Sequence, residues 1–381
     1  MSNDYRTLKA LHCADLHLGA PFSGLGAVRQ ASRLEDQRNA FSKIIELCRR
    51  EDAEILLIAG DLFDSARPAE DLVDMVRDGF SSIRSVKVLI SPGNHDPASA
   101  GSIYLYEDFW PDNVYIFKGS LEKTMFEDLG LIVWGAGFTG AYQDKPLFDL
   151  RLQAGESGGF INICLMHADV VKAGALSAYN PISEQAISAS GIDYFALGHV
   201  HKRKEALRLG SSYYSYPGSP EGLGFDEPGA RGVHIGQIGG GICAMRFQPV
   251  SQRAYFDIDV DVSGIGRPGI AEEIKRAVKR LAGDGYEGNL YRVHLCGEVD
   301  EGGVLSVENI SAALPELFYL KVIDGTRVVV DKKAHSGDNS LRGLFVKKMI
   351  EKLEENPEDE SLQLALKLGL RAFSGKVNCR V

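Results

Sequence analysis

The stretch Ile55-Leu56-Leu57-Ile58-Ala59-Gly60-Asp61 is an apolar run that ends in a glycine and an acidic residue. The run has the length and aliphatic content of a buried strand. Apolar runs of this kind occur five times before residue 200; they are Leu8–Cys13, Ile55–Ala59, Val86–Ile90, Ile161–Leu165 and Tyr194–Leu197. A short polar cluster follows each run; the clusters are Asp15-Leu16-His17, Gly60-Asp61, Gly93-Asn94-His95-Asp96, Met166-His167 and Gly198-His199-Val200-His201.

Between these runs lie segments with apolar residues at helical spacing, Arg33–Arg50 and Asp71–Ile83 among them. Strands that alternate with helices predict βαβ units in an α/β fold. Sites in open α/β sheets gather beyond the carboxyl ends of the strands. We therefore expect the five clusters to meet on one rim, where Asp15, Asp61, one asparagine and five histidines predict a metal site.

The first two clusters offer oxygen and nitrogen ligands. Asp15 and His17 stand two residues apart, which in an extended backbone directs both side chains to the same side. Asp61 follows Gly60, and each of its carboxylate oxygens can bind one cation. Taken singly, such clusters are more often turns or helix caps, and Asp64 suits a capping or supporting role. The five clusters together favour the metal site.

The cluster Pro92-Gly93-Asn94-His95-Asp96 is the most specific of the five. The amide oxygen of Asn94 is a candidate metal ligand. His95 is expected to face the substrate as a catalytic residue. Asp96 is expected to assist catalysis by holding the His95 ring in one tautomer, as carboxylates often do beside metal sites.

The last two clusters add three histidines. His167 alone would more often be a core or surface histidine, whereas His199 and His201 repeat the two-residue spacing of the first cluster. The other histidines receive a structural interpretation; they are His12, His234, His294 and His335. Mixed nitrogen and oxygen ligation fits Mn²⁺, Fe²⁺ or Zn²⁺ better than Ca²⁺.

The composition is that of an ordinary globular protein. Of 381 residues, 44% are hydrophobic and 25% charged, and the length suits two or three domains. No apolar segment approaches the roughly 18 residues that span a bilayer, and the N-terminus lacks the features of a signal peptide. The six cysteines form no Cys-x-x-Cys pair, which predicts reduced thiols and a cytoplasmic location.

The charge balance bears on nucleic-acid binding. A net charge of −10 argues mildly against a protein coated in nucleic acid. It does not exclude a nuclease, since a metal site supplies positive charge of its own. The basic run Lys202-Arg203-Lys204 follows the last histidine pair and is either a phosphate contact or a solvated face.

The chain is expected to form three segments. Residues 1–250 hold the runs and clusters and predict the catalytic body. Residues 251–335 repeat strand and helix patterns on a smaller scale and predict a compact α/β unit. Residues 336–381 contain two amphipathic helical patterns, Leu341–Leu353 and Leu362–Phe373. Their apolar faces either pack on the protein itself or dock onto a partner.

Together the clusters resemble the signature of the calcineurin-like metallophosphoesterases: Asp-x-His, Gly-Asp, Gly-Asn-His-Asp/Glu, His and Gly-His-x-His. The resemblance implies a β-sandwich flanked by helices (αββα), with a small α/β cap domain and C-terminal helices. It implies that one metal is bound by Asp15, His17, Asp61 and His201. It implies that a second metal is bound by Asp61, Asn94, His167 and His199. Asp61 would then bridge the metals, and His95 would face the scissile phosphate.

Further details resemble the SbcD-type DNA repair exonucleases; they are Leu11–Gly19, Gly60–Asp64 and Tyr216–Pro220, followed by Phe225 and Glu227. Residues 20–24 are more similar to the Firmicute YhaO subgroup. This resemblance implies a DNA nuclease with two divalent ions, Mn²⁺ by preference, that hydrolyses phosphodiesters through a water activated between the metals. It also implies that the C-terminal helices dock onto an SMC-like ATPase. It leaves a homodimer open.

Two other functions remain open. One is a small-molecule phosphodiesterase or phosphatase, for example one acting on nucleotides, with the same metal core. The other is a non-enzymatic subunit that binds DNA ends or an SMC-like ATPase. The cap and the helical tail argue against the first, and the complete ligand set argues against the second.

Overall fold

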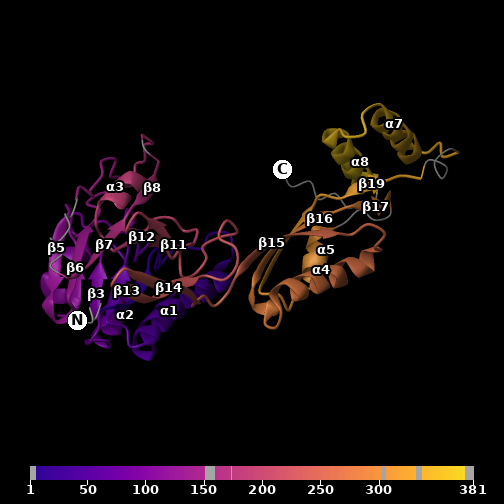
Figure 1. The fold of residues 1–381 in the computed structure, drawn as a ribbon. Coiled ribbons are helices and arrows are strands. Elements are labelled where there is room, and N and C mark those ends of the chain that lie inside the picture. Colours follow the sequence, from indigo (N-terminus) through magenta and orange to yellow (C-terminus); the bar gives the residue numbers. More distant parts are fainter. Residues whose placement is uncertain (1–5, 151–158, 173, 302–305, 332–336, 374–381) are drawn as a thin grey trace. The chain divides into compact units, whose positions relative to one another are not determined.

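The computed structural model describes residues 6–150, 159–172, 174–301, 306–331 and 337–373 (Figure 1). The chain divides into two compact units, Met1–Ala254 and Tyr255–Val381. The division into segments 1–250, 251–335 and 336–381 stays a prediction. Among the helices of the described ranges, none has both the length and the apolar character needed to cross a membrane.

Two six-stranded sheets form the first unit. The first sheet contains, in spatial order, β14 (Ile242–Pro249), β13 (Gly232–Gly239), β1 (Leu8–Cys13), β2 (Ile55–Ile58), β3 (Lys87–Ile90) and β4 (Val114–Ile116). The strands β1 to β4 are parallel, and β13 and β14 extend the sheet in antiparallel fashion. The five predicted apolar runs are all strands, with ends that differ by at most two residues.

The second sheet contains, in spatial order, β11 (Lys204–Leu209), β12 (Ser212–Tyr216), β10 (Tyr194–Gly198), β7 (Ile161–His167), β6 (Leu131–Ala136) and β5 (Glu122–Phe126). Its four inner strands are parallel, and β11 and β5 lie antiparallel at the two edges.

Successive side chains of a strand point to opposite faces of its sheet, so one set packs between the two sheets and the other packs under the helices. Ala10 of β1 lies in a shared core with Ile163 of β7, so the two sheets pack against each other. Leu11, the next residue of β1, packs with Phe41 and Ile44 of a helix on the other side. Because inner strands are covered on both faces, their sequences are apolar throughout.

Helices cover the two outer faces. The helices α1 (Ala27–Arg50) and α2 (Glu70–Ser81) pack on the first sheet. The short helix α3 (Glu184–Ala189) packs through Ile187 on the second sheet. The predicted helix–sheet–sheet–helix architecture is confirmed. The strands of the five runs are divided between the two sheets, because β7 and β10 belong to a different sheet from β1, β2 and β3.

Short elements complete this unit; they are η1 (Ile103–Leu105), η2 (Glu107–Phe109), η3 (Glu127–Leu129), β8 (Asp169–Val171) and β9 (Pro181–Ser183). The strands β8 and β9 pair with each other in parallel. Because β8 follows β7 directly, the pair lies close to the polar cluster at the end of β7.

The second unit is a smaller α/β structure. A parallel sheet contains β15 (Tyr255–Asp261), β16 (Leu290–Cys296) and β18 (Tyr319–Asp324), and a second pair contains β17 (Glu298–Asp300) and β19 (Arg327–Val329). The helical elements are α4 (Arg267–Ala282), η4 (Tyr286–Gly288), α5 (Val307–Ala312), α7 (Leu341–Glu355) and α8 (Glu360–Phe373).

The two C-terminal helices pack on their own unit. Val346 of α7 and Leu366 of α8 belong to the same buried core as Val322 of β18. The half of the helical prediction that placed an apolar face on the protein itself therefore agrees with the packing. A second apolar set on these helices is exposed; it contains Leu341, Leu344, Leu364 and Leu368.

Candidate metal centre

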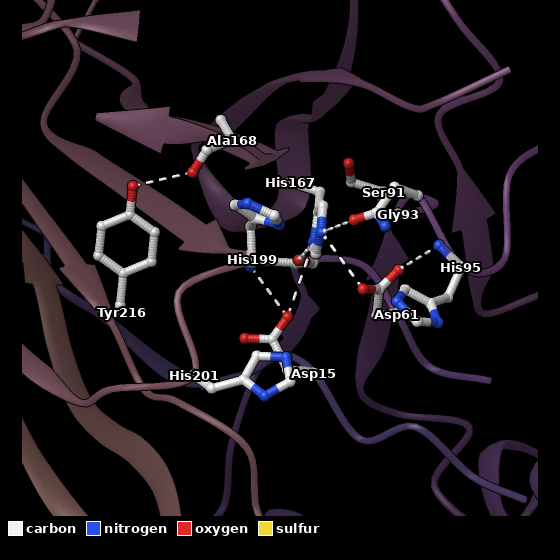
Figure 2. Close-up of polar contacts among 12 residues, drawn as sticks. Asp15, Asp61, Ser91, Gly93, His95, His167, Ala168, His199, His201 and Tyr216 are labelled. Atoms are coloured by element: carbon white, nitrogen blue, oxygen red, sulfur yellow. Dashed lines mark hydrogen bonds and ion pairs between the residues drawn. The ribbon is translucent and has the colours of Figure 1, made fainter. Parts of the chain in front are cut away.

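The predicted ligands follow the carboxyl ends of strands in both sheets, at the place where the two sheets meet (Figure 2). From the first sheet come Asp15, His17, Asp61, Asn94 and His95, and from the second come His167, His199 and His201. Direct contacts link the residues of the two sheets. The structure therefore brings all seven predicted metal ligands and His95 to one centre.

Four of these residues have a left-handed backbone. The φ angles are 54° at Asp15, 44° at His17, 48° at Asp61 and 95° at His199. Non-glycine residues adopt such angles at a cost of about 1–3 kcal/mol each, and they concentrate at functional sites. The expectation that Asp15 and His17 share one side of an extended strand is wrong. Their side chains converge because the chain turns sharply after β1.

Glycines in the clusters make room for the ligands. A Cβ added at Gly93 would overlap with the carboxylate of Asp61. Gly60 has a φ of 89°, and a Cβ there would overlap with the ring of His167. Gly60 and Gly93 are thus each required by a predicted ligand that comes from another strand.

His17 and His201 form one half of the centre. Nδ1 of His17 lies 3.0 Å from Oδ1 of Asp64, and Nδ1 of His201 is hydrogen-bonded to Glu227. A carboxylate only accepts hydrogen bonds, so each Nδ1 carries the hydrogen. In the neutral rings both Nε2 atoms then have a lone pair, and they face each other at 3.1 Å. A cation bound between them would convert this repulsion into coordination.

Glu227 also governs the charge of His201. Burial lowers the pKa of His201, but the hydrogen bond to Glu227 and the neighbouring carboxylates outweigh it and raise the pKa to about 9. Ser219 and Arg231 contact Glu227 in turn, so the carboxylate is held in place.

His167 and Asn94 form the other half. Nδ1 of His167 donates to the carbonyl oxygen of Ala59 at 2.9 Å, which leaves a lone pair on Nε2. That Nε2 lies 3.0 Å from Oδ1 of Asn94, which is also an acceptor. Two acceptors at this distance again fit a cation that both can bind.

Asp61 lies between the halves. Its Oδ2 is 3.6 Å from Nε2 of His17 and 3.4 Å from Nε2 of His167. Its Oδ1 accepts a hydrogen bond from the backbone N–H of His95 at 2.9 Å. Burial raises the pKa of Asp61, but the charges of His167 and His17 lower it further than burial raises it. This position fits a carboxylate shared by two cations.

Asp15 supplies an unsatisfied oxygen. The residue is fully buried, and its Oδ1 accepts a hydrogen bond from the backbone N–H of His199 at 2.9 Å. Its Oδ2 has no hydrogen-bond partner among the described residues. A buried carboxylate oxygen without a partner is costly unless a cation binds it. Groups of acid and imidazole atoms within 4.8 Å of one another include Asp15, His17 and His201, and Asp15, Asp61 and His167. The donor set therefore fits divalent metals.

His199 borders the centre on the side of β8 and β9. Its ring lies 5.1 Å from the ring of His167, and Tyr179 packs on it at 4.4 Å between ring centres. Burial, followed by the charge of His167, lowers the pKa of His199. A neutral imidazole is the form that binds metals.

His95 is the most exposed histidine of the set, with 46% of its side chain accessible. Its Nδ1 lies 3.5 Å from Oδ1 of Asp64, and its ring packs edge-on against that of His17 at 4.7 Å. The hydrogen bond to Asp64 raises the pKa of His95 to about 9. A partly exposed, cationic ring beside the ligands is suited to contact a substrate oxygen.

The predicted role of Asp96 is wrong. Asp96 is buried, and its oxygens accept hydrogen bonds from the backbone of Gly93 and Phe63 and from the Tyr104 hydroxyl. Burial and the charge of Asp61 raise the pKa of Asp96 to about 6. Asp96 thus fixes the turn that carries Asn94, while Asp64 holds the His95 ring.

Glu227 was noted in the sequence only as part of the family resemblance, and no role was predicted for it. It lies in a loop rich in glycine and proline, 26 positions after His201, and no spacing rule connects the two. Asp64 has the supporting role that was one of its two predicted roles, because it binds both His17 and His95.

Comparisons with known proteins agree with this centre. A profile of the calcineurin-like phosphoesterases matches residues 8–203, which is more than half of the chain. The chain is 29% identical over 266 residues to the uncharacterized metallophosphoesterase YhaO of Bacillus subtilis, covering 67% of this chain and 64% of YhaO. It is 26% identical over 294 residues to the DNA double-strand break repair protein Mre11 of Methanopyrus kandleri, covering 72% and 63%.

In both pairs the match spans a little under two thirds of the relative's length. Among solved structures, a dimetal phosphatase from Danio rerio aligns with a TM-score of 0.38 and 11% identity, over 64% of this chain and 98% of that one. That score is too low to support an argument, so the assignment rests on the profile and on the two sequence relatives. The chain belongs to the calcineurin-like phosphoesterase family.

Proposed function

We propose that this chain is a phosphodiesterase that uses two divalent metal ions to hydrolyse DNA. The calcineurin-like phosphoesterases are metal-dependent hydrolases of phosphoesters, so phosphoester hydrolysis is the reaction expected of a family member. The observation that carries the proposal is the shared position of Asp61, whose Oδ2 lies within 3.6 Å of an imidazole nitrogen on each side. Such an arrangement suits two neighbouring cations that clamp one phosphate.

The residues divide the work as follows. Metal ions bound there would supply Lewis-acid activation of a phosphate oxygen and of a water. Asp15, His17, Asp61 and His201 would hold one ion, and Asp61, Asn94, His167 and His199 the other. His95 would donate a hydrogen bond to the phosphate or a proton to the leaving oxygen, since its ring is exposed and Asp64 holds it in place. The mixed nitrogen and oxygen donors support Mn²⁺ as the metal, with Fe²⁺ or Zn²⁺ as alternatives.

DNA as the substrate is supported by the relatives. Two relatives are named DNA double-strand break repair protein Mre11, and this chain is 26% identical to each. The YhaO relative is named only as a metallophosphoesterase, so it supports the chemistry and leaves the substrate open.

We also propose that an SMC-like ATPase docks on the C-terminal helices. The exposed side chains of Leu341 and Leu344 on α7, and of Leu364 and Leu368 on α8, support this partner. Leucines that are about half or more exposed on two adjacent helices suit an apolar helical partner.

The test is Mn²⁺-dependent hydrolysis of end-labelled single- and double-stranded DNA, with bis-p-nitrophenyl phosphate as a small diester beside it. The matched variant is His95→Ala. We expect DNA degradation that the variant loses, and the ladder of products would give the polarity. Hydrolysis of the small diester alone, also when an SMC-like ATPase is added, would favour a small-molecule phosphodiesterase. Absence of both activities in metal-loaded protein would favour a binding subunit.

A further inference from the structure

A basic run begins directly after the metal ligand His201. Lys202, Arg203 and Lys204 are all exposed, in a chain whose net charge is −10. Lys204 is the first residue of β11, an edge strand of the second sheet. Adjacent Cα atoms are about 3.8 Å apart, so the run starts at the border of the centre.

The backbone of the run is firmly held. The guanidinium of Arg231 donates to the carbonyl oxygen of His201, and Arg231 is almost fully buried. A Cβ at Gly218 would overlap with that same carbonyl and approach the backbone N of Arg203, so the loop at Gly218 packs closely on the run. Pairing of Lys204 with Tyr216 of β12 fixes its other end.

Aromatic rings support two of the three cations. The guanidinium carbon of Arg203 lies 3.9 Å from the centre of the Phe247 ring, and Nζ of Lys204 lies 5.3 Å from the centre of the Tyr216 ring. Such cation–π contacts restrain a side chain without neutralising its charge. Figure 2 shows Tyr216 on the His199 side of the centre, away from His95.

The lysines retain their charge for a ligand. Arg203 pairs with Glu205, with 3.1 Å between Nε and Oε1. Neither Lys202 nor Lys204 forms an ion pair with any residue that the structure describes. An exposed lysine on a restrained backbone beside a phosphate-cleaving centre is well placed to bind a second phosphate.

We propose that Lys202, Arg203 and Lys204 form a basic strip that binds the backbone phosphates next to the scissile one. The strip would make the centre prefer a nucleic-acid strand, which has neighbouring phosphates, to a small diester, which has none. This inference rests on the proposed function and names the residues that select its substrate.

The test compares two charge-neutralised proteins of full length. The double variant Lys202→Gln/Lys204→Gln removes two charges of the strip. The control is Lys123→Gln on β5, the opposite edge of the same sheet, where Nζ of Lys123 lies 5.5 Å from the centre of the Trp134 ring. Both Lys123 and Lys204 are thus exposed edge-strand lysines over an aromatic ring.

Two readouts separate the strip from the chemistry. The first is the ratio of kcat/KM on a fluorescent 20-nucleotide single strand to kcat/KM on bis-p-nitrophenyl phosphate, both with Mn²⁺. The second is binding of the same strand without added metal, followed by anisotropy at several salt concentrations. For the double variant we expect the ratio to fall about tenfold and the salt slope to drop by about 1.4, since each single-strand phosphate contact contributes about 0.7. Lys123→Gln should change neither.

An unchanged kcat/KM ratio and an unchanged salt slope in the double variant would show that the strip does not bind backbone phosphates. An equal loss on both substrates would overturn it as well, because the mutations would then act on the centre itself. The parent protein could cleave no DNA while the double variant still binds the strand more weakly and with a smaller salt slope. That result would contradict the proposed nuclease function but support phosphate binding by the strip.

Discussion

The Nε2 atoms of His17 and His201 face each other at 3.1 Å, although the Nδ1 of each ring already binds a carboxylate. Two neutral imidazoles in these tautomers repel each other through their lone pairs. The acids Asp64 and Glu227 therefore hold the two rings in an arrangement that is favourable only around a positive charge. Before a metal ion binds, a proton on His201, whose pKa is raised to about 9, supplies this charge, and a metal ion takes its place.

A first prediction concerns stability. Saturating Mn²⁺ should raise the unfolding temperature of the first unit, because the ion binds the folded chain and not the unfolded one. At a concentration of 100 times Kd, one site contributes about 2.7 kcal/mol, or roughly 5–10 °C for a unit of this size. Differential scanning calorimetry with and without Mn²⁺ measures the shift.

Asp61→Asn provides the matched comparison for that experiment, since it keeps the shape but removes the shared negative charge. The variant should show a smaller shift, and isothermal titration should give fewer than two ions per chain. An equal shift in Asp61→Asn would contradict the bridging position of Asp61.

A second prediction separates two neighbouring carboxylates. Asp64→Asn should lower kcat on bis-p-nitrophenyl phosphate by about 10–100-fold, because the rings of His17 and His95 both lose the carboxylate charge that orients them. Asp96→Asn should instead lower the free energy of unfolding by about 1–3 kcal/mol, because its new N–H₂ group would face the N–H donor of Phe63 or that of Gly93, depending on which oxygen it replaces. Steady-state kinetics and urea unfolding of both variants check this, and the reverse pattern would restore the role first expected of Asp96.

The contrast between Asp64 and Asp96 marks the limit of reading this site from sequence. The strands were predictable because each is a short apolar run buried on both faces, and the chain order of the clusters predicted which residues meet at the centre. Adjacency in sequence misled at Asp96, because the residue after His95 turns into the core toward Tyr104. The contact that matters comes from Asp64, 31 positions earlier, through the meeting of β2 and β3.

Two further features of the centre could not be predicted from the sequence, because they depend on tertiary contacts. The left-handed backbone of Asp15, His17, Asp61 and His199 is enforced by tertiary contacts against the local preference of these residues. The partnership of Glu227 with His201 depends on a loop whose path is set by buried contacts such as that of Arg33 with Glu221. The two-sheet arrangement was expected only through family resemblance, since apolar runs alone do not show how their strands are divided between sheets.

A third prediction concerns Gly93. Gly93→Ala should weaken Mn²⁺ affinity by about 10–100-fold, because the new methyl group must displace the Asp61 carboxylate. It should also lower the free energy of unfolding by about 1–3 kcal/mol through overpacking. Gly140→Ala is the control, since a Cβ there meets no atom within 4 Å. Titration calorimetry measures the affinity, and unchanged binding in Gly93→Ala would contradict the tight contact with Asp61.

A fourth prediction concerns pH and a buried polar group away from the metal ligands. His234 is fully buried on β13, where Nδ1 contacts Ser215 at 3.0 Å and Nε2 has no hydrogen-bond partner among the described residues. Burial, with a smaller effect of the Arg203 charge, lowers the pKa of His234 to about 4. The unfolded chain takes up this proton near pH 6.5, so between about pH 6.5 and 4 the unfolded state binds more protons than the folded state.

The free energy of unfolding should therefore fall as the pH drops through that window. The contribution of His234 is about 1.4 kcal/mol per pH unit and roughly 3 kcal/mol in total. Above pH 6.5 this contribution is constant. His234→Gln removes the titrating group, so its unfolding free energy should fall less steeply than that of the parent protein between pH 6.5 and 4.5. Urea unfolding at half-unit pH intervals measures both slopes, and parallel curves would show that His234 takes up its proton equally in the folded and unfolded chain.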